Sequence, residues 1–347
     1  MEVLPVGKIP PSLLAELLAG LDDDPRVLKG PAVGEDAAIV LPPEGQYLVV
    51  TADPITFATD RLPQYALAVN ANDIYVTGGI PRFFTAICLF PAGVTDEDVR
   101  EFFKQLIRSA RTVGCVIVGG HTEVVEGISN PLVSGQMLGF VEPAHLVDNT
   151  NARPGDLLVL AGPVAIEGTA IMARAAPGLC SEVLGAAGRE EAVGLLDEPG
   201  ICVGPAARVV FDVIKPRACH DPTDGGLLAA VWELGKAAGC GARLVRRSVP
   251  VLPACRRLCE AFDLDPLGLI ASGSLLCAVA RGDAPKLLEA LQREEIPSAV
   301  IGELLPEEEG FLLVEDETER PFPETFQDEI VSFYEKIASE ESDLGEE

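Results

Sequence analysis

The sequence predicts a mixed α+β protein built from two domains. Helix-like and strand-like segments interleave along its 347 residues, but several neighbouring strands are spaced as hairpins, which favours mixed sheets over a doubly wound parallel sheet. A chain of this length, 48% hydrophobic, is too long for one ordinary core and about right for two. The turn-rich sequence NARPGD marks the boundary. We therefore expect domains at 1–150 and 151–320, followed by a helix and acidic tail at 321–347.

The first half contains well-marked elements. Pro10 and Pro11 precede a leucine-rich helix, and GEDAAIV and QYLVVTAD are expected to pair as strands around the turn PPEG. The largely apolar segment LPQYALAVNANDIYV predicts a helix that ends at Gly78, and FFTAICLF predicts a buried strand. The clearest helix begins after the N-cap Thr95 and ends at Gly114. CVIVGG and LVSGQMLGFVE complete this half as strands.

The second half restarts with the strand LLVLAG. Further strands are expected at SLLCAVA, SAVIGEL and GFLLVED, and a last amphipathic helix carries Phe326, Ile330 and Phe333. The remaining helices are predicted near residues 165–175, 204–215, 226–238, 253–262 and 284–294.

The charge of the chain excludes several classes of partner. The net charge is −28, and residues 303–347 alone hold 17 acidic and 2 basic side chains. Such a surface repels nucleic acid and anionic lipid, and no apolar run approaches the roughly 20 residues that span a bilayer. The first residues lack the pattern of a signal peptide, and the nine cysteines are scattered, as reduced buried thiols are. We expect a cytoplasmic protein with no nucleic-acid or membrane partner.

One polar stripe lies inside the apolar helix. Asn70, Asp73 and Thr77 share a face at i, i+3 and i+7. A buried carboxylate is costly unless it is paired or bound to a cation, and no lysine or arginine occurs between Arg61 and Arg82. Mg²⁺, which prefers carboxylate oxygens and usually bridges to substrate phosphates, is one natural counter-charge. The alternative is a stripe that forms internal hydrogen bonds or lines a subunit contact.

Other acidic residues stand where predicted strands or helices begin or end. Asp36 precedes the strand AAIV, and Asp53 follows YLVVTA. Asp221 and Asp224 belong to HDPTDGG, before a predicted helix. This loop either caps the helix or, with its paired glycines, allows close approach of a phosphate.

A third candidate stretch is VGGHTEV, where paired glycines lead into His121, Thr122 and Glu123. A strand-to-loop step of this kind presents polar groups to an anion or a metal. The sequence contains no G-x-x-x-x-G-K-[ST] motif and no G-x-S-x-G motif. With only three histidines, a histidine-rich zinc site is implausible.

Several of these motifs, taken in chain order, resemble the AIR synthase superfamily over roughly residues 5–315. They are GEDAAIV, TADPITF, LAVNANDIYVTGGIPRF, VGGHTEV, ARPGDLLVLAG and HDPTDGGLLAAVWELG. The superfamily includes aminoimidazole ribonucleotide synthase, thiamine-monophosphate kinase, selenophosphate synthetase and the hydrogenase maturation protein HypE. The later stretch VPVLPACRRLCEAFDLDPLGLIASGSLLCAV is most similar to HypE.

The resemblance implies a PurM-like fold, in which an N-terminal α/β domain pairs across a homodimer and a C-terminal α+β domain follows. It implies ATP and Mg²⁺ as cofactors, with ATP activating an amide-type or phosphate oxygen. Its HypE branch implies hydrogenase maturation, ATP-dependent dehydration of a carbamoyl group and a maturation-protein partner.

The predicted site follows from these motifs. The expected metal ligands are Asp36, Asp53, Asp73 and Asp221. Cofactor contacts are expected from Asp36, Asn70, Asp73, Thr122, Asp221, Thr223 and Gly225. Catalytic roles are expected for His121, Glu123 and Asp224.

Two departures from the family bear on the reaction. HypE and the kinase branch usually have aspartate where this chain has His121. An imidazole is a poor ligand for Mg²⁺, so His121 is expected to hydrogen-bond a phosphate or position the substrate, or else to be structural. HypE also acts on a cysteine near its C-terminus, whereas the last cysteine here is Cys277, inside a predicted apolar strand.

The acceptor is therefore expected to be a small molecule or a thiol of another protein. The alternatives are a small-molecule kinase similar to thiamine-monophosphate kinase, and a non-catalytic nucleotide-binding scaffold.

Overall fold

The computed structural model describes residues 3–4, 7–30, 39–58, 60–316 and 318–344. It separates the chain into two compact units, Met1–Leu146 and Val147–Glu347. Asp36 lies outside the described residues. Among those that are described, every helix is too short or too polar to cross a lipid bilayer.

Unit 1 is built on a five-stranded mixed sheet in the order β1-β6-β5-β7-β4. Only β5 and β6 run parallel, and the other neighbours in this sheet are antiparallel. A separate pair, β2 and β3, is also antiparallel. The elements are β1 (Gly7–Lys8), α1 (Pro11–Leu18), β2 (Val27–Lys29), β3 (Ile39–Val40), β4 (Tyr47–Pro54), α2 (Leu62–Val76), β5 (Ile80–Pro91), α3 (Asp96–Val113), β6 (Val116–Val125) and β7 (Leu132–Val141).

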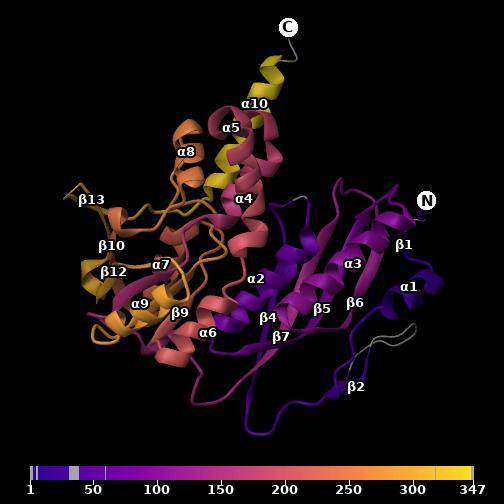
Figure 1. Ribbon diagram of the computed structural model, residues 1–347, viewed down its shortest axis with the longest axis horizontal. Helices are drawn as coiled ribbons and strands as arrows, with labels where there is room; N and C mark the ends of the chain where they lie inside the picture. The colour runs from indigo at the N-terminus through magenta and orange to yellow at the C-terminus, as the bar shows by residue number, and fades with distance from the viewer. Residues whose placement is uncertain (1–2, 5–6, 31–38, 59, 317, 345–347) are drawn as a thin grey trace. The chain divides into compact units, whose positions relative to one another are not determined.

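Helices α2 and α3 cover one face of this sheet (Figure 1). As the sequence predicts, Thr95 is the N-cap of α3. The structure adds a capping box, in which Thr95 accepts a hydrogen bond from the backbone of Asp98 and Asp98 accepts one from the backbone of Thr95. It ends at Gly114 in the left-handed conformation. Helix α2 lies close to β7 because Gly135 has no side chain: a Cβ there would come within 2.6 Å of the Asn70 amide and of the Phe84 ring.

The predicted pairing of GEDAAIV with QYLVVTAD falls mostly outside the described residues, which include only Ile39 and Val40 of the first segment. Strand β4 pairs with β7, from Tyr47 opposite Val141 to Pro54 opposite Ser134. The short β3 pairs with β2. The turn PPEG is a local signal that gives no indication of the distant partner β7.

Unit 2 contains a seven-stranded sheet in the order β14-β13-β10-β12-β8-β11-β9, with β10 and β13 parallel and the other neighbours antiparallel. Its strands are β8 (Leu157–Ala161), β9 (Ala218–His220), β10 (Cys240–Val245), β11 (Leu275–Val279), β12 (Ser298–Pro306), β13 (Phe311–Glu315) and β14 (Thr318–Pro321). Its α-helices are α4 (Ile166–Ala175), α5 (Pro177–Gly194), α6 (Gly204–Val213), α7 (Gly226–Ala238), α8 (Pro253–Ala261), α9 (Ala284–Arg293) and α10 (Glu329–Leu344).

The predicted helices of this half are all present, but no sequence signal predicts α5. That helix is rich in glycine, and Gly185, at φ 77°, kinks it. It is held by packing against α4 and α8. Strand β11, predicted from its apolar run, is buried along its whole length. The nine cysteines form no disulfide, and eight of them are buried, as expected for reduced core thiols.

Helix α10 packs into the core of unit 2 through its apolar face. Ile330 and Phe333 are fully buried, and the Phe333 ring meets Phe262 edge to face at 5.1 Å between centroids. The segment that leads into α10 contacts the loop after β9 and the loop before β11 through Asp328.

Candidate functional site

The polar stripe of α2 joins the helix to β4. The Asn70 side chain is fully buried; its Oδ1 accepts a hydrogen bond from the Asp53 backbone N–H at 3.0 Å, and its Nδ2 donates to the Ala66 carbonyl at 2.9 Å. The Thr77 hydroxyl donates to the Ile74 carbonyl. Asn70 and Thr77 therefore form internal hydrogen bonds, which was the alternative to a metal site for this stripe.

Asp73 differs from its neighbours in the stripe. Its Oδ2 accepts a hydrogen bond from the Thr51 hydroxyl at 2.5 Å, and the residue is only half-buried. Thr51 and Asp53 are two residues apart on β4, so both side chains point to the face that α2 covers. The carboxylates of Asp53 and Asp73 therefore lie on the same face of the sheet. Thr51 orients the Asp73 carboxylate, a positioning role that no sequence signal indicates.

The stretch VGGHTEV forms strand rather than loop. Strand β6 continues to Val125, and its register places His121 opposite Ile87 and Thr122 opposite Cys88. Cys88 is buried, whereas Ile87 is 38% exposed on the face that the helices leave open. His121 therefore lies on the open face and Thr122 on the helix-covered face.

His121 and Glu123 form a pair on that open face. The His121 Nε2 lies 3.1 Å from a carboxylate oxygen of Glu123, as expected for residues i and i+2 of a strand. The sheet itself separates this pair from Asp53 and Asp73 within unit 1. The structure thus brings the predicted residues of unit 1 together as two groups on opposite faces.

In unit 2 the loop HDPTDGG follows β9. His220 stands at its start, with Nε2 2.9 Å from the Glu233 carboxylate and Nδ1 3.1 Å from the carbonyl oxygen of Asp221. Burial alone would lower the pKa of His220, but Asp221 and Glu233 outweigh it and raise the pKa to about 10. His220 therefore carries a positive charge beside the buried Asp221 at neutral pH.

The N-terminus of α7 is not capped by Asp224. The N-cap residue is Gly225, in the left-handed conformation at φ 74°, and its backbone N–H donates to Asp328 Oδ2 at 2.8 Å. The N–H of Gly226 donates to the Thr223 carbonyl. Asp224 therefore does not cap the helix. The N–H groups of Gly225 and Gly226, which a phosphate would use, already donate to acceptors within the chain.

Asp328 joins three segments of unit 2. Besides Gly225, it accepts hydrogen bonds from the backbone N–H of Ile270 at 3.1 Å and of Ile330 at 2.8 Å. Burial raises its pKa to about 6, although these N–H groups act in the opposite direction. The carboxylate is 2% exposed, so these contacts form in an interior where hydrogen bonds are costly to lose.

Glu167, in the first turn of α4, lies near Asp328 and Asp221. Burial raises its pKa to about 7; Ser272 opposes this rise, and the charges of the two aspartates add to it. His220, Glu167 and Asp328 were not among the residues predicted from the sequence. A signal existed for Asp328, which stands before an amphipathic helix where N-caps occur, and for Glu167, an isolated acid in an apolar segment.

Within the ranges that the structure describes, no three His, Cys, Asp or Glu side chains converge to form a metal site. Asp53 on β4 and Asp73 on α2 are the two predicted metal ligands that the structure places on one face of the unit 1 sheet.

The fold and these motifs define a two-domain protein of the AIR synthase type. Residues 34–141 match the family of the AIR synthase related protein, N-terminal domain, and residues 153–315 match its C-terminal domain. The chain belongs to the AIR synthase related family.

Its relatives include proteins with different reactions. Carbamoyl dehydratase HypE of Escherichia coli (strain K12) is 29% identical over 258 residues, 73% of each chain. Selenide, water dikinase of Geobacter metallireducens is 30% identical over 281 residues, 77% of this chain and 74% of that protein. A crystal structure of HypE in complex with ATP has a TM-score of 0.72 at 21% identity, covering 90% of this chain and 95% of the other; at that identity it establishes the shared fold.

Proposed function

We propose that this protein is a Mg²⁺-dependent, ATP-using enzyme that activates a carbamoyl-type oxygen, as its carbamoyl dehydratase relative does. The observation behind the proposal is that Asp73, on a largely apolar helix, accepts a hydrogen bond from Thr51 of β4 on the face that also carries Asp53. The family membership of the chain and its similarity to carbamoyl dehydratase HypE supply the reaction class.

The residues present fit Mg²⁺. Carboxylates are the ligands this cation prefers, and it usually takes one or two of them together with substrate phosphates. Asp53 and Asp73 supply two, Thr51 fixes the orientation of one of them, and Asp36 is proposed as a third. Asp221, in unit 2, is separately proposed as a metal ligand. When bound, Mg·ATP would supply the phosphoryl group that makes the carbamoyl oxygen a leaving group.

Other side chains are proposed to position the site and to bind the nucleotide. Asn70 holds the Asp53 backbone in place, while Thr122, Thr223 and Gly225 are proposed to contact the nucleotide. Gly225 is proposed to do so other than through its N–H, which Asp328 holds.

Proton transfer and substrate positioning are proposed for His121, Glu123 and Asp224, although His121 and Glu123 lie on the face of the unit 1 sheet opposite to Asp53 and Asp73. The contact between His121 and Glu123 makes the histidine a suitable donor to a phosphate or substrate oxygen. The protonated His220 places positive charge beside Asp221.

The proposal predicts a large loss of ATP turnover in Asp73→Asn. Removing one charged ligand of the cation is expected to lower ADP release about a hundredfold, a change that corresponds to roughly 3 kcal/mol in the activation barrier. Purified wild type, Asp73→Asn and the exposed-site control Asp23→Asn are assayed with Mg·ATP and an S-carbamoyl thiol peptide. Equal rates in all three proteins would show that Asp73 has no role in the reaction.

The acceptor is tested in parallel. Thiamine monophosphate replaces the carbamoyl peptide in the same assay. ADP release with thiamine monophosphate alone would reassign the chain to the kinase reaction, and no release with either acceptor, despite ATP binding, would support the non-catalytic scaffold or an untried acceptor. A hydrogenase-maturation protein is proposed as a partner that carries the acceptor thiol.

The open face of the unit 1 sheet supports a homodimer. It presents Leu48, Val50 and Ile87, which are 52%, 61% and 38% exposed, and exposed apolar side chains on one sheet face suit a protein–protein contact. Light scattering is expected to give twice the chain mass, and Val50→Glu is expected to halve it, whereas Leu28→Glu on β2 leaves it unchanged. A monomeric wild type would remove this part of the proposal.

A further inference from the structure

One stretch of this acidic chain contains no acid. The chain as a whole has 54 acidic and 26 basic side chains. Residues 234–259, however, hold six lysines and arginines and not one aspartate or glutamate. This stretch forms the end of α7, strand β10, the turn at Arg246–Ser248 and most of α8. Acids from other segments pair with two of these six residues: Glu303 and Glu319 with Arg243, and Asp265 and Glu315 with Arg246.

The stretch borders a cavity of about 310 Å³, which we call the arginine pocket. Arg246, Arg247 and Arg256 line it together with Pro266, Leu267 and the β13 residues Val314 and Glu315. Val249 and Val251, which join the turn to α8, add apolar surface. All of these residues belong to unit 2, and in Figure 1 the labels β10, β13 and α8 locate the elements around the pocket.

The three arginines are not equivalent. Arg246 is fixed by a bidentate pair with Asp265, at 2.9 and 2.6 Å, and by Glu315 at 2.7 Å. Arg247 and Arg256 are exposed, and neither has an acidic partner among the residues that the structure describes. Two guanidinium groups at the pocket therefore form no ion pair within the described structure, although Glu315 and Asp316 also line the pocket.

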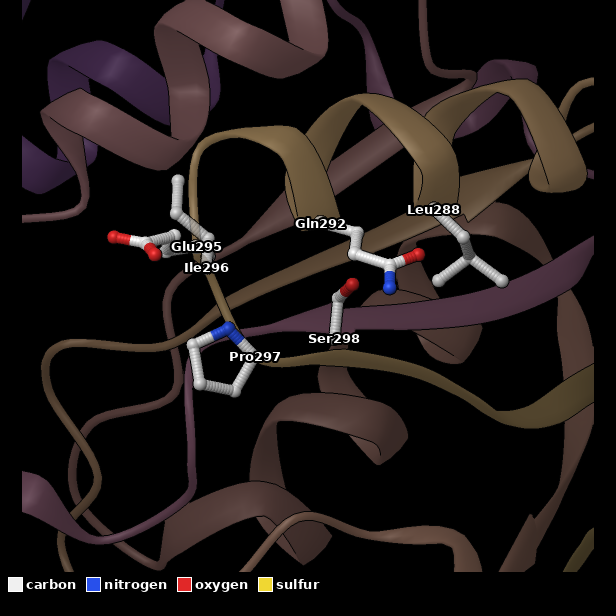
Figure 2. A pocket seen from close by; sticks show the side chains of 6 residues that line it. All are labelled: Leu288, Gln292, Glu295, Ile296, Pro297 and Ser298. Carbon is white, nitrogen blue, oxygen red and sulfur yellow. The ribbon is translucent and has the colours of Figure 1, made fainter.

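A second cavity of unit 2 has no arginine or lysine in its lining. It measures about 400 Å³ and lies between α9 and β12. Figure 2 shows the Gln292 amide and the Ser298 hydroxyl pointing toward one another beside Pro297. Its lining includes Glu295 and no basic residue, so it has no feature that selects an anion.

We propose that the arginine pocket binds a small phosphate monoester. The phosphate group carries a charge of roughly −1.5 to −2 at pH 7, so it can pair with both of the guanidinium groups that form no ion pair, whereas a carboxylate carries only one charge. The planar fork of arginine suits phosphate oxygens. Val249, Val251 and Leu267 provide an apolar wall for the carbon part of the ester.

The size of the pocket limits the ligand further. Pockets for small molecules span roughly 300–1,000 Å³, so a cavity of about 310 Å³ suits an ester with one ring or one sugar. Glu315 and Asp316, which also line it, oppose a ligand with further negative groups but can accept hydrogen bonds from hydroxyls.

The test uses phenyl phosphate, inorganic phosphate and benzoate as probes. Isothermal titration of the full chain, without nucleotide or metal, is expected to show that phenyl phosphate binds at least tenfold more tightly than either of the others. Arg247→Gln and Arg256→Gln are each expected to weaken phenyl phosphate at least tenfold. Arg257→Gln is the matched control, because it removes the same charge from α8 at a side chain outside the pocket that contacts the Val183 carbonyl.

Three results would overturn the proposal. Equal losses in Arg257→Gln and Arg256→Gln would show that only the general charge of α8 matters, and benzoate binding as tightly as phenyl phosphate would remove the preference for phosphate. No heat with phenyl phosphate at millimolar concentration would remove the site altogether. Circular dichroism of each variant checks that it is folded. Because no ATP is present, these outcomes are independent of the proposed reaction.

Discussion

Replacing Asp328 by alanine is expected to lower the free energy of unfolding by roughly 5 kcal/mol. The substitution removes the acceptor of three backbone N–H groups, those of Gly225, Ile270 and Ile330, and a hydrogen bond to a charged group contributes about 1.5–3 kcal/mol. Small domains have a total stability of about 5–15 kcal/mol. The variant is therefore expected to be at the limit of folding, and urea denaturation followed by circular dichroism measures the loss.

The asparagine variant at the same position provides the matched comparison. Oδ1 of Asp328 accepts from both Ile270 and Ile330, while Oδ2 accepts from Gly225 alone. Asp328→Asn keeps one acceptor oxygen, so its loss is expected to be about half as large or less. A cost below about 1 kcal/mol for the alanine variant would contradict the role of Asp328 as the junction of these segments.

Replacing Glu167 by glutamine is expected to stabilise the protein at pH 8 by about 3 kcal/mol. The pKa of Glu167 is about 7 in the folded chain, against an ordinary value of 4.5, because burial disfavours the charged carboxylate. The folded state keeps the proton that the unfolded state loses, so the wild type loses stability as the pH rises from about 4.5 to about 7. Glutamine is neutral throughout and avoids this loss.

The pH dependence separates this explanation from a simple packing effect. Urea unfolding at pH 4.5, 6 and 8 is expected to show a difference between Glu167→Gln and wild type that is close to zero at pH 4.5 and grows up to pH 8. A difference that is the same at all three pH values would mean that Glu167 does not titrate in the folded protein near neutrality.

Local signals in the sequence predict the helices well. Thr95, Asp98 and Gly114 define the ends of α3 through contacts within a few residues, and the structure confirms them. The mixed two-domain fold and the AIR synthase family are likewise confirmed. The partner of β4 could not be predicted, because β7 lies some 80 residues further along the chain and no local pattern encodes that pairing.

In the candidate site, too, local sequence patterns predict some residues but not the tertiary contacts between them. Asn70 and Asp73 are visible in the sequence because polar residues interrupt an apolar helix, whereas Thr51, which holds Asp73, gives no signal on its own. His121 was expected in a loop, but pairing with β5 keeps it in a strand. Tertiary packing alone brings Glu167 within the electrostatic influence of Asp328, and spacing along the chain does not reveal this.

Isothermal titration of the wild type with ATP, once with 5 mM Mg²⁺ and once with EDTA, tests the central claim most directly. The account predicts saturable binding at one site per chain with Mg²⁺, little or none with EDTA, and a loss of most of the Mg²⁺-dependent binding in Asp73→Asn. Equal binding with Mg²⁺ and EDTA, or identical isotherms for wild type and Asp73→Asn, would contradict it.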